Sequence, residues 1–255
     1  MDYQYWGKYL YQAQKKGIAV EPITDSEKAL SVDDGYKIQE FLMDYRCNDG
    51  EKIMGAKAGL TSVAKQKAMG VSEPVYGMIT DKMMLESGAK VNLNQFIHPR
   101  VEPEIVFILG KDISGYNLTI EEILDSTESV CCGLEIIDSR YLDFRFTLAD
   151  VVADNTSASA FILGKPIALT SLELEYTGCL LEINNEVVAT ATGAAVLGHP
   201  ARAVSLLASW LYTQGKSLKK GWAVLSGGLT NAFPLEPNNY VNGSFAHLGS
   251  VSIQI

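Results

Sequence analysis

The chain has 255 residues, of which 47% are hydrophobic and 20% are charged, and its formal net charge at pH 7 is -9. This length and composition are typical of a globular protein with a sizeable core. The negative charge argues against nucleic acid as a partner, because binding phosphates requires clustered lysine and arginine. We find no signal-peptide pattern and no apolar run of the roughly 18 to 20 residues that a membrane span needs. A cytoplasmic protein with reduced cysteines and no membrane partner is therefore expected.

The N-terminal part is predicted to be helical. Apolar residues recur at helical spacing before a break at Gly17, and a second helix is expected to begin after Ser31, which is a favourable N-cap residue. Residues 53–80 are rich in glycine and other small residues, a pattern typical of a loop-rich binding region.

The chain is predicted to become strand-rich from about residue 100. Asn184 and Asn185 separate two apolar runs and suit a tight hairpin turn. An amphipathic helix is expected over residues 204–214, with His199 and Pro200 at its start and Gly215 after its end. The predicted strands are VEPEIVFILG (101–110), CCGLEIIDS (131–139), ASAFILG (158–164) and CLLEINNEVVATATG (179–193).

These elements predict an α+β fold. Strands and helices do not alternate regularly, so parallel βαβ winding is not expected. We predict a small N-terminal helical region over residues 1–75 and a β-rich catalytic domain over residues 76–255.

The stretch HPRVEPEIVFILG, residues 98–110, contains two glutamates in alternating positions. On a strand, Glu102 and Glu104 would project from the same face. Two carboxylates beside an apolar run are costly to bury, and a divalent cation would relieve their repulsion. Oxygen ligands of this kind select magnesium or manganese over zinc. The alternative is a solvent-facing strand that carries glutamate for solubility.

A third glutamate, Glu135, lies in an otherwise apolar predicted strand. Strict alternation puts it on one face with Gly133 and Ile137, which would be a poor solvent-facing surface, and a buried acid requires a partner. Three glutamates would leave coordination positions free to chelate a 2-oxo acid. The alternative is a structural salt bridge from Glu135 to Arg140 or Arg100.

Lys57 lies between two glycines, where the backbone can approach an anionic substrate closely. The alternative for a single lysine is a solvated surface position. Asp154 and Asn155 could cap a turn as easily as line a pocket. The segment SGGLT, residues 226–230, matches neither a phosphate-binding loop nor a nucleophile elbow, and none of the three histidines has metal-ligand spacing.

Seven motifs, taken together and in order, extend the interpretation. The sequence resembles the hydratase/decarboxylase family of meta-cleavage pathways, which degrade catechol-derived carbon skeletons, within the fumarylacetoacetate hydrolase-like superfamily. The motifs are KAGLTS (57–62), GVSEPVYG (70–77), HPRVEPE (98–104), LEIIDSRY (134–141), VVADN (151–155), GAAVLGHP (193–200) and SGGLT (226–230).

The resemblance implies a small N-terminal domain, a β-rich barrel-like roll around the site, and Mg²⁺ or Mn²⁺ as cofactor. It assigns the metal ligands to Glu102, Glu104 and Glu135 and the active-site lysine to Lys57. It further implies a small unsaturated 2-oxo acid as substrate and a homo-oligomer, and it leaves open a complex with the related pathway enzyme. Substrate contacts are implied for residues in or next to the motifs: Leu60, Val75, Tyr76, Asp138, Ser157 and Thr230.

Two activities occur in the family that the chain resembles. One is 4-oxalocrotonate decarboxylase, and the other is 2-hydroxypenta-2,4-dienoate hydratase. Hydratases tend to read QPDFG where this chain reads EPVYG, so that Val75 replaces an aspartate, and they tend to have glutamine at the position of His98. The segment TNAFP, residues 230–234, is likewise similar to the decarboxylase branch. We therefore predict the decarboxylase, with the hydratase as the alternative.

Two other function classes compete with this prediction. A non-catalytic metal-binding subunit would keep the carboxylates but have a blocked pocket. A hydrolase of acylpyruvates or fumarylacetoacetate would rely on a histidine–glutamate pair to activate water, and the early glycine-rich region contains no histidine.

Overall fold

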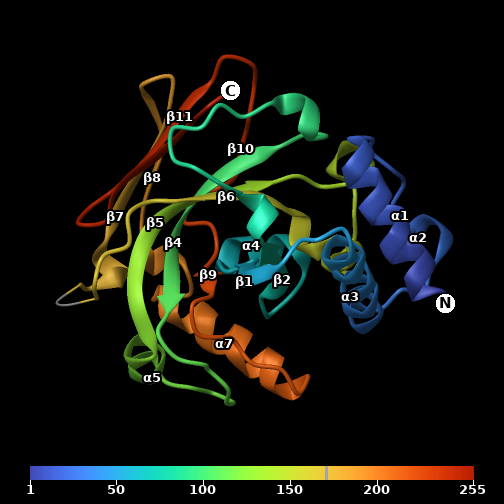
Figure 1. Cartoon of the computed structure of the whole chain (residues 1–255), viewed down its shortest axis with the longest axis horizontal. Coiled ribbons are helices and arrows are strands. Elements are labelled where there is room, and N and C mark those ends of the chain that lie inside the picture. Colours follow the sequence, from blue (N-terminus) through green and yellow to red (C-terminus); the bar gives the residue numbers. More distant parts are fainter. Residues whose placement is uncertain (170–171) are drawn as a thin grey trace.

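The computed structural model describes residues 1–169 and 172–255. Its α+β architecture consists of N-terminal helices beside a large curled sheet, with a second, smaller sheet packed on the first (Figure 1). The predicted fold class is thus confirmed. Within the described residues, no helix has both the length and the apolar character required to cross a bilayer.

Three helices form the N-terminal region: α1 (Tyr3–Lys16), α2 (Ile23–Ser26) and α3 (Val32–Asn48). Their ends follow the sequence signals, because Gly17 terminates α1 in the left-handed conformation with φ 64°. The Ser31 side chain accepts a hydrogen bond from the backbone N–H of Asp34, whose carboxylate accepts one in return, and so forms a capping box. Leu10 and Leu42 lie in the apolar cluster that joins these helices.

The large sheet has the strand order β2-β1-β9-β4-β5-β6-β3, with β10 paired to β4. Because the sheet curls, β2 also contacts β6, and inward-facing residues such as Val106 and Phe161 form a cluster inside the curl. The strands are β1 (Ile53–Gly59), β2 (Val75–Thr80), β3 (Met84–Leu85), β4 (Arg100–Leu109), β5 (Thr127–Ile137), β6 (Ala158–Leu163), β9 (Ala223–Leu225) and β10 (Phe233–Pro234).

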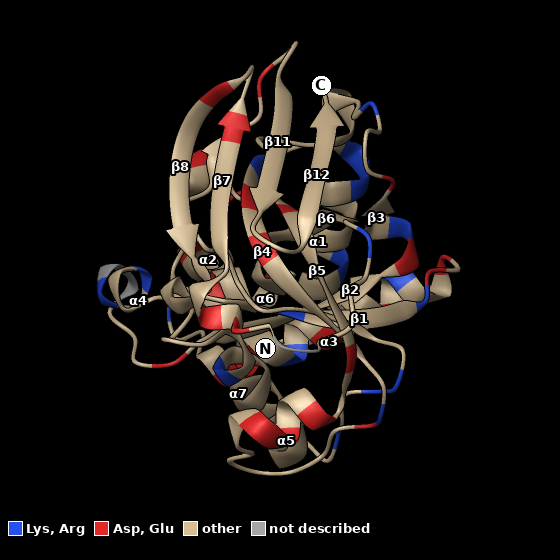
Figure 2. Cartoon of the chain, turned by 90° about the vertical axis from the view of Figure 1, so that its left-hand side faces the viewer, with Lys and Arg blue, Asp and Glu red and all other residues tan. Residues whose placement is uncertain are grey.

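The smaller sheet covers the outer face of the large one, and Figure 2 shows its strands side by side in front of β4 and β5. Its order is β12-β11-β7-β8. Leu134 of β5 belongs to the same core cluster as Leu181 and Val241 of the smaller sheet. Asn184 and Asn185 both adopt positive φ in the predicted hairpin turn. The strands are β7 (Gly178–Ile183), β8 (Glu186–Thr192), β11 (Tyr240–Phe245) and β12 (Gly249–Gln254).

Four further helices connect the strands: α4 (Val63–Met69), α5 (Ile120–Asp125), α6 (Leu148–Ala153) and α7 (Pro200–Thr213). The last begins at Pro200, as expected from the placement of His199 and Pro200 at its start. His199 is its N-cap, since Nδ1 accepts a hydrogen bond from the backbone N–H of Ala201 at 3.0 Å. The predicted cap is therefore confirmed.

The prediction of a loop-rich region over residues 53–80 is wrong. This stretch forms β1, α4 and β2, and two of its glycines, Gly55 and Gly77, allow close packing. A Cβ at Gly55 would overlap the carbonyl oxygen of Ala223, and one at Gly77 would lie 2.6 Å from that of Asn155. The strand β1 also runs parallel to β9. The domain boundary at residue 75 stays a prediction.

Candidate active site

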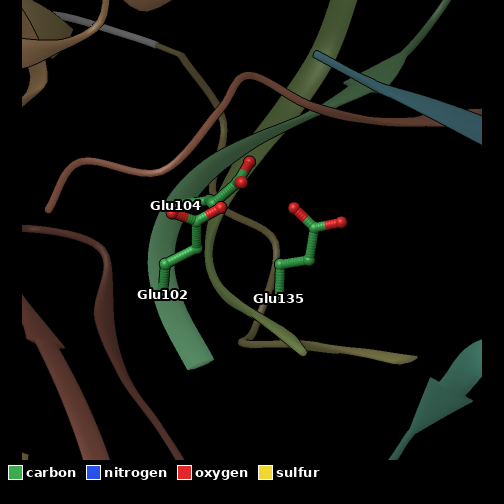
Figure 3. Close-up of side chains that lie close together, drawn as sticks. All are labelled: Glu102, Glu104 and Glu135. Atoms are coloured by element: carbon green, nitrogen blue, oxygen red, sulfur yellow. The ribbon is translucent and has the colours of Figure 1, made fainter. Parts of the chain in front are cut away.

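Three glutamates converge inside the curled sheet. Glu102 and Glu104 project from one face of β4, and Glu102 lies directly opposite Glu135 in the antiparallel pairing of β4 with β5. All three are buried, and one oxygen from each lies within 4.8 Å of the others. Figure 3 shows the three carboxylates directed into the same space. Strand alternation predicts the first pair, and the register between β4 and β5 adds the third.

The segment of residues 226–230 lies along β4 between the two short strands that pair with it. β9 pairs with residues 106–108 and β10 with residues 100–101. Pro103 lies between these pairings, and its carbonyl accepts a hydrogen bond from the backbone N–H of Leu229 at 2.9 Å. Because proline has no N–H to donate, it suits a position where regular pairing is interrupted. The SGGLT segment therefore forms one side of the carboxylate site.

Two glycines of this segment contact the carboxylates. The backbone N–H of Gly227 donates a hydrogen bond to Glu104 Oε2 at 2.7 Å. Gly227 has φ 110°, which favours glycine, and a Cβ at Gly228 would overlap Glu102 Oε2. Both glycines are thus required by the site, although the segment matches no phosphate or nucleophile motif.

The three carboxylates supply oxygen ligands that suit a cation, and their buried charges require one nearby. Within the described residues, Glu104 Oε1 and Glu135 Oε2 are buried without a hydrogen-bond partner. Burial, reinforced by the carboxylates of Glu135 and Glu102, raises the pKa of Glu104 well above its ordinary value. Such a set of oxygens fits a hard divalent cation, which would satisfy the unpartnered atoms and offset the repulsion.

Lys57, on β1, is the buried cation of the site. Its Nζ lies 2.9 Å from Glu135 Oε1 and donates a hydrogen bond to the carbonyl of Thr156 at 3.2 Å. Burial lowers the pKa of Lys57, but the carboxylates of Glu135, Glu102 and Glu104 outweigh this effect and raise it overall. The ammonium therefore stays charged beside the carboxylates, and the surface alternative for Lys57 is wrong.

The turn that receives Lys57 has an unusual backbone. Asn155, Thr156 and Ser157 all have positive φ, at 49°, 53° and 57°. Each such residue costs of order 1–3 kcal/mol and persists only where surrounding contacts impose it. The Asn155 side chain supplies such contacts, because it accepts a hydrogen bond from the Met78 N–H and donates one to the Met78 carbonyl. The Thr156 hydroxyl is buried without a hydrogen-bond partner among the described residues.

A second lysine, Lys65 on α4, was not identified from the sequence. Its Nζ donates a hydrogen bond to Glu102 Oε2 at 2.8 Å, and its side chain is 24% exposed. The helix carries Lys65 to this position because Ser62 caps it and Gln66 binds the carbonyl of Leu60. The signal in the sequence was weak, since a lysine on a short helix is usually solvated.

Three residues predicted to contact substrate lie on or beside the β1–β2 pair. Gly77 lies opposite Lys57, so Val75 faces the same side as the lysine and Tyr76 faces the other. The Tyr76 ring packs 5.2 Å from Trp210 and is not brought to the carboxylates. Leu60 follows β1 with φ 56°. The predicted substrate contacts of these residues stay predictions.

The other three residues predicted to contact substrate, Asp138, Ser157 and Thr230, lie outside the β1–β2 pair. The Asp138 carboxylate accepts hydrogen bonds from the backbone N–H groups of Ile97 and His98, and so holds the segment that precedes β4. Ser157 accepts the Asp138 N–H through its carbonyl in the strained turn. Thr230 lies apart from them, in a cavity that also contains Lys65. Their contacts with substrate likewise stay predictions.

The alternative salt bridges proposed for Glu135 are wrong. Arg140 is fully buried and pairs with Asp154, while Arg100 lies over the ring of Phe144. Asp154 thus has a structural role, because its carboxylate also accepts the backbone N–H of Arg140. Glu135 has Lys57 as its partner.

Known enzymes can be aligned with this chain over most of its length. No protein-family model matches the chain. It is 39% identical over 246 residues to a 4-oxalocrotonate decarboxylase of Pseudomonas sp, an alignment that covers 95% of this chain and 94% of the relative. It is 37% identical over 243 residues to a 2-keto-4-pentenoate hydratase of Paraburkholderia xenovorans (strain LB400), with 95% and 90% covered. The chain belongs to the hydratase/decarboxylase family.

Solved structures agree with this assignment. The 4-oxalocrotonate decarboxylase from Pseudomonas putida G7, complexed with magnesium and adipate, superposes with a TM-score of 0.96 at 33% identity. The match covers 99% of this chain and 96% of that one. A fumarylpyruvate hydrolase from Pseudomonas aeruginosa has a TM-score of 0.61 at 14% identity and covers 78% and 87%. The latter likeness shows a shared fold alone.

Proposed function

We propose that this enzyme is a divalent-metal-dependent decarboxylase that converts 4-oxalocrotonate (2-oxohex-3-enedioate) to 2-hydroxypenta-2,4-dienoate in the breakdown of aromatic compounds. The observation that carries the proposal is the buried carboxylate triad with Lys57 against it. The proposal includes a cytoplasmic homo-oligomer and leaves association with the related pathway enzyme as a further prediction.

Glu102, Glu104 and Glu135 are proposed to hold Mg²⁺ or Mn²⁺. Their orphaned oxygens support this assignment, and so does the magnesium complex of the decarboxylase from Pseudomonas putida G7. A cation held there would supply Lewis-acid polarisation of the substrate's 2-oxo group.

The reaction breaks the bond between C5 and the distal carboxylate and releases CO₂. The electron pair of that bond becomes the C4–C5 double bond, the former C3–C4 pair moves to C2–C3, and the 2-oxo oxygen gains the negative charge. One proton on this oxygen completes 2-hydroxypenta-2,4-dienoate. The protein must therefore stabilise charge at the 2-oxo end, where it develops.

Lys57 is suited to that task. Its ammonium is buried and stays charged, and the Thr156 carbonyl and Glu135 fix its direction. We assign to it the neutralisation of charge on the substrate, or the delivery of the proton near the enolate oxygen. A buried cation needs no solvent reorganisation when charge develops beside it, which favours this role.

Val75 supports the decarboxylase over the hydratase. It lies on the Lys57 side of β2 and is buried, where hydratases tend to have aspartate. Decarboxylation requires no group that activates water, so an apolar residue there is compatible with it. Hydration of the dienol requires a group that delivers water or a proton. The alternative activity is 2-hydroxypenta-2,4-dienoate (2-oxopent-4-enoate) hydratase.

The test is to incubate the protein with Mg²⁺ and 2-oxohex-3-enedioate while following CO₂ and the absorbance of the dienol. We expect CO₂ release that stops on addition of EDTA. If no CO₂ appears but separately supplied 2-hydroxypenta-2,4-dienoate is consumed, the enzyme is the hydratase. If neither compound is consumed, the non-catalytic alternative replaces both. Cleavage of acylpyruvates would instead identify a hydrolase.

A further inference from the structure

The second lysine of the site, Lys65, has donors that the structure leaves unused. A lysine ammonium has three N–H groups. Within the described part of the chain, the ammonium of Lys65 makes one interaction, the hydrogen bond to Glu102 Oε2. Lys57, in contrast, is 2% exposed and is held by both Glu135 and Thr156. Of these two lysines, Lys65 is the one with access to incoming solute.

A cavity of about 350 Å³ lies where Lys65 is exposed, between α4, β8 and the segment 228–233. It lies beside Glu102, because two of its lining residues, Lys65 and Gly228, approach Glu102 Oε2. The other lining residues are hydroxyl, amide and apolar groups: Ser62, Val188, Ala189, Thr190, Leu229, Thr230, Asn231 and Phe233. Lys65 is thus the cation of a cavity whose walls suit a short carbon chain.

We propose that Lys65 recognises the distal carboxylate of the substrate and so makes the enzyme selective for dicarboxylates over monocarboxylates. Bound in this way, the substrate would extend from the carboxylate triad along the cavity beside Thr230, with its second carboxylate at the Lys65 ammonium. A charge-assisted hydrogen bond at a largely buried site is strong enough to discriminate between the two classes. This inference rests on the proposed function, since it names the part of the site that holds the leaving group.

The proposed role of Lys65 is in substrate binding, and the chemistry of the reaction predicts how its loss changes KM and kcat. Pairing the ammonium with the distal carboxylate stabilises the bound substrate, whereas the same group loses its negative charge as CO₂ departs. Lys65 therefore favours the ground state at least as much as the transition state. Replacing it should raise KM for 2-oxohex-3-enedioate without lowering kcat.

The experiment measures binding without catalysis, by calorimetry on the Mg²⁺-loaded protein. Adipate, a saturated six-carbon dicarboxylate, is compared with hexanoate, which has the same length but one carboxylate. We expect the unaltered protein to bind adipate at least about tenfold more tightly, as one charged hydrogen bond of 1.5–3 kcal/mol would give. Lys65→Met should abolish this preference and Lys65→Arg should retain it. Lys67→Met, on the exposed part of the same helix, is the matched control and should also retain it.

The binding measurements test the role of Lys65 independently of whether the enzyme is a decarboxylase. Equal binding of adipate and hexanoate by the unaltered protein, or an undiminished preference in Lys65→Met, would overturn the role of Lys65 even if CO₂ release is observed. A preference lost in Lys65→Met with no CO₂ release would support the role of Lys65 and reject the decarboxylase. Lys65→Gln serves as a second variant, with Mg²⁺ binding as the check of folding.

Discussion

Glu102 and Glu135 stand directly opposite each other on adjacent antiparallel strands, both buried. Like charges in such a cross-strand pair are destabilising, and burial increases the penalty because solvent screens them poorly. The two lysines each neutralise one member, Lys57 at Glu135 and Lys65 at Glu102. Glu104 accepts a hydrogen bond from a backbone N–H but pairs with no lysine among the described residues. Its negative charge is therefore the least well neutralised of the three.

Glu104→Gln should stabilise the protein in the presence of a chelator while removing its stabilisation by Mg²⁺. The change keeps an acceptor for Gly227 N–H and removes a buried charge, a gain of about 1 kcal/mol or more. Because the pKa of Glu104 is raised, its ionised form costs stability, so the advantage of the variant should grow as pH rises above about 4.5. Urea unfolding across pH, with and without Mg²⁺, measures both effects. Exposed Glu86→Gln is the control, and an equal gain there would contradict the explanation.

Gly228→Ala should weaken Mg²⁺ binding by about tenfold. The added Cβ would overlap Glu102 Oε2 and rotate this carboxylate away from the other two, and displacing supporting contacts of a metal site typically costs 10–100-fold. Calorimetric titration with Mg²⁺ measures the loss. Gly178→Ala is the matched control, since a Cβ there meets no atom within 4 Å and the residue has no positive φ. Unchanged affinity in Gly228→Ala would show that Glu102 adapts or does not bind the metal.

Substitutions of Lys57 distinguish its two assigned roles. Lys57→Met should lower kcat/KM by about 100-fold or more, since it removes the charge and leaves Glu135 unpaired. Lys57→Arg retains the charge but does not release a proton near neutral pH. Activity retained in the arginine variant would assign charge neutralisation, and activity lost in both variants would favour proton delivery. Normal kcat/KM in Lys57→Met would reject either role; Lys52→Met, at an exposed position, is the control.

Val75→Asp should reduce CO₂ release and increase consumption of 2-hydroxypenta-2,4-dienoate. The new carboxylate would lie on the Lys57 side of β2, where it can deliver a proton or direct water. Burying this polar group should cost about 1–3 kcal/mol of stability. Val75→Asn imposes a similar polar burden without an acid, so a ratio of the two activities that shifts equally in both variants would exclude an acid–base explanation.

His199 should make stability depend on pH near neutrality. Burial lowers its pKa below 6.5, as does Arg202, while Glu175 acts in the opposite direction, and the cap requires an unprotonated Nδ1. The neutral imidazole therefore contributes fully above pH 6.5, and stability is lost as pH falls, because the unfolded chain takes up the proton first. His199→Ser keeps a capping group that does not titrate. The difference in unfolding free energy between the two proteins should shift in favour of the serine variant from pH 7.5 to 5.5; a constant difference would contradict this.

Local signals in the sequence accounted for much of the fold. The C-terminal end of α1 at Gly17, the start of α3 after Ser31, the Asn184–Asn185 turn and the cap at His199 each depend on a few neighbouring residues, and each was predicted. Residues 53–80 were misassigned because glycine was interpreted as a loop signal. Glycine is instead required at positions 55 and 77 because other backbone segments pack directly against them. These contacts come from distant parts of the chain, so the local sequence pattern does not reveal them.

Less of the candidate site could be predicted from local sequence patterns. The same-face placement of Glu102 and Glu104 follows from the period of a strand, but their meeting with Glu135 depends on the register between β4 and β5. Lys57 was assigned a role through the family resemblance, and its burial follows from how β1 fits the sheet. Lys65 was missed because its partner, Glu102, is 37 residues away in sequence.

The interruption at Pro103 has a consequence for how such enzymes diversify. Gly227 and Gly228 contact the carboxylates, but Thr230 and Asn231 follow them outside the ladder pairing of β9 and β10 and line the neighbouring cavity. These two positions can therefore change in size and polarity without altering the wall that holds the carboxylates. The proposed metal ligands and the proposed substrate cavity therefore lie on separate parts of the surroundings of β4. Substitutions in one short segment could thus reshape the cavity while the three carboxylates stay in place.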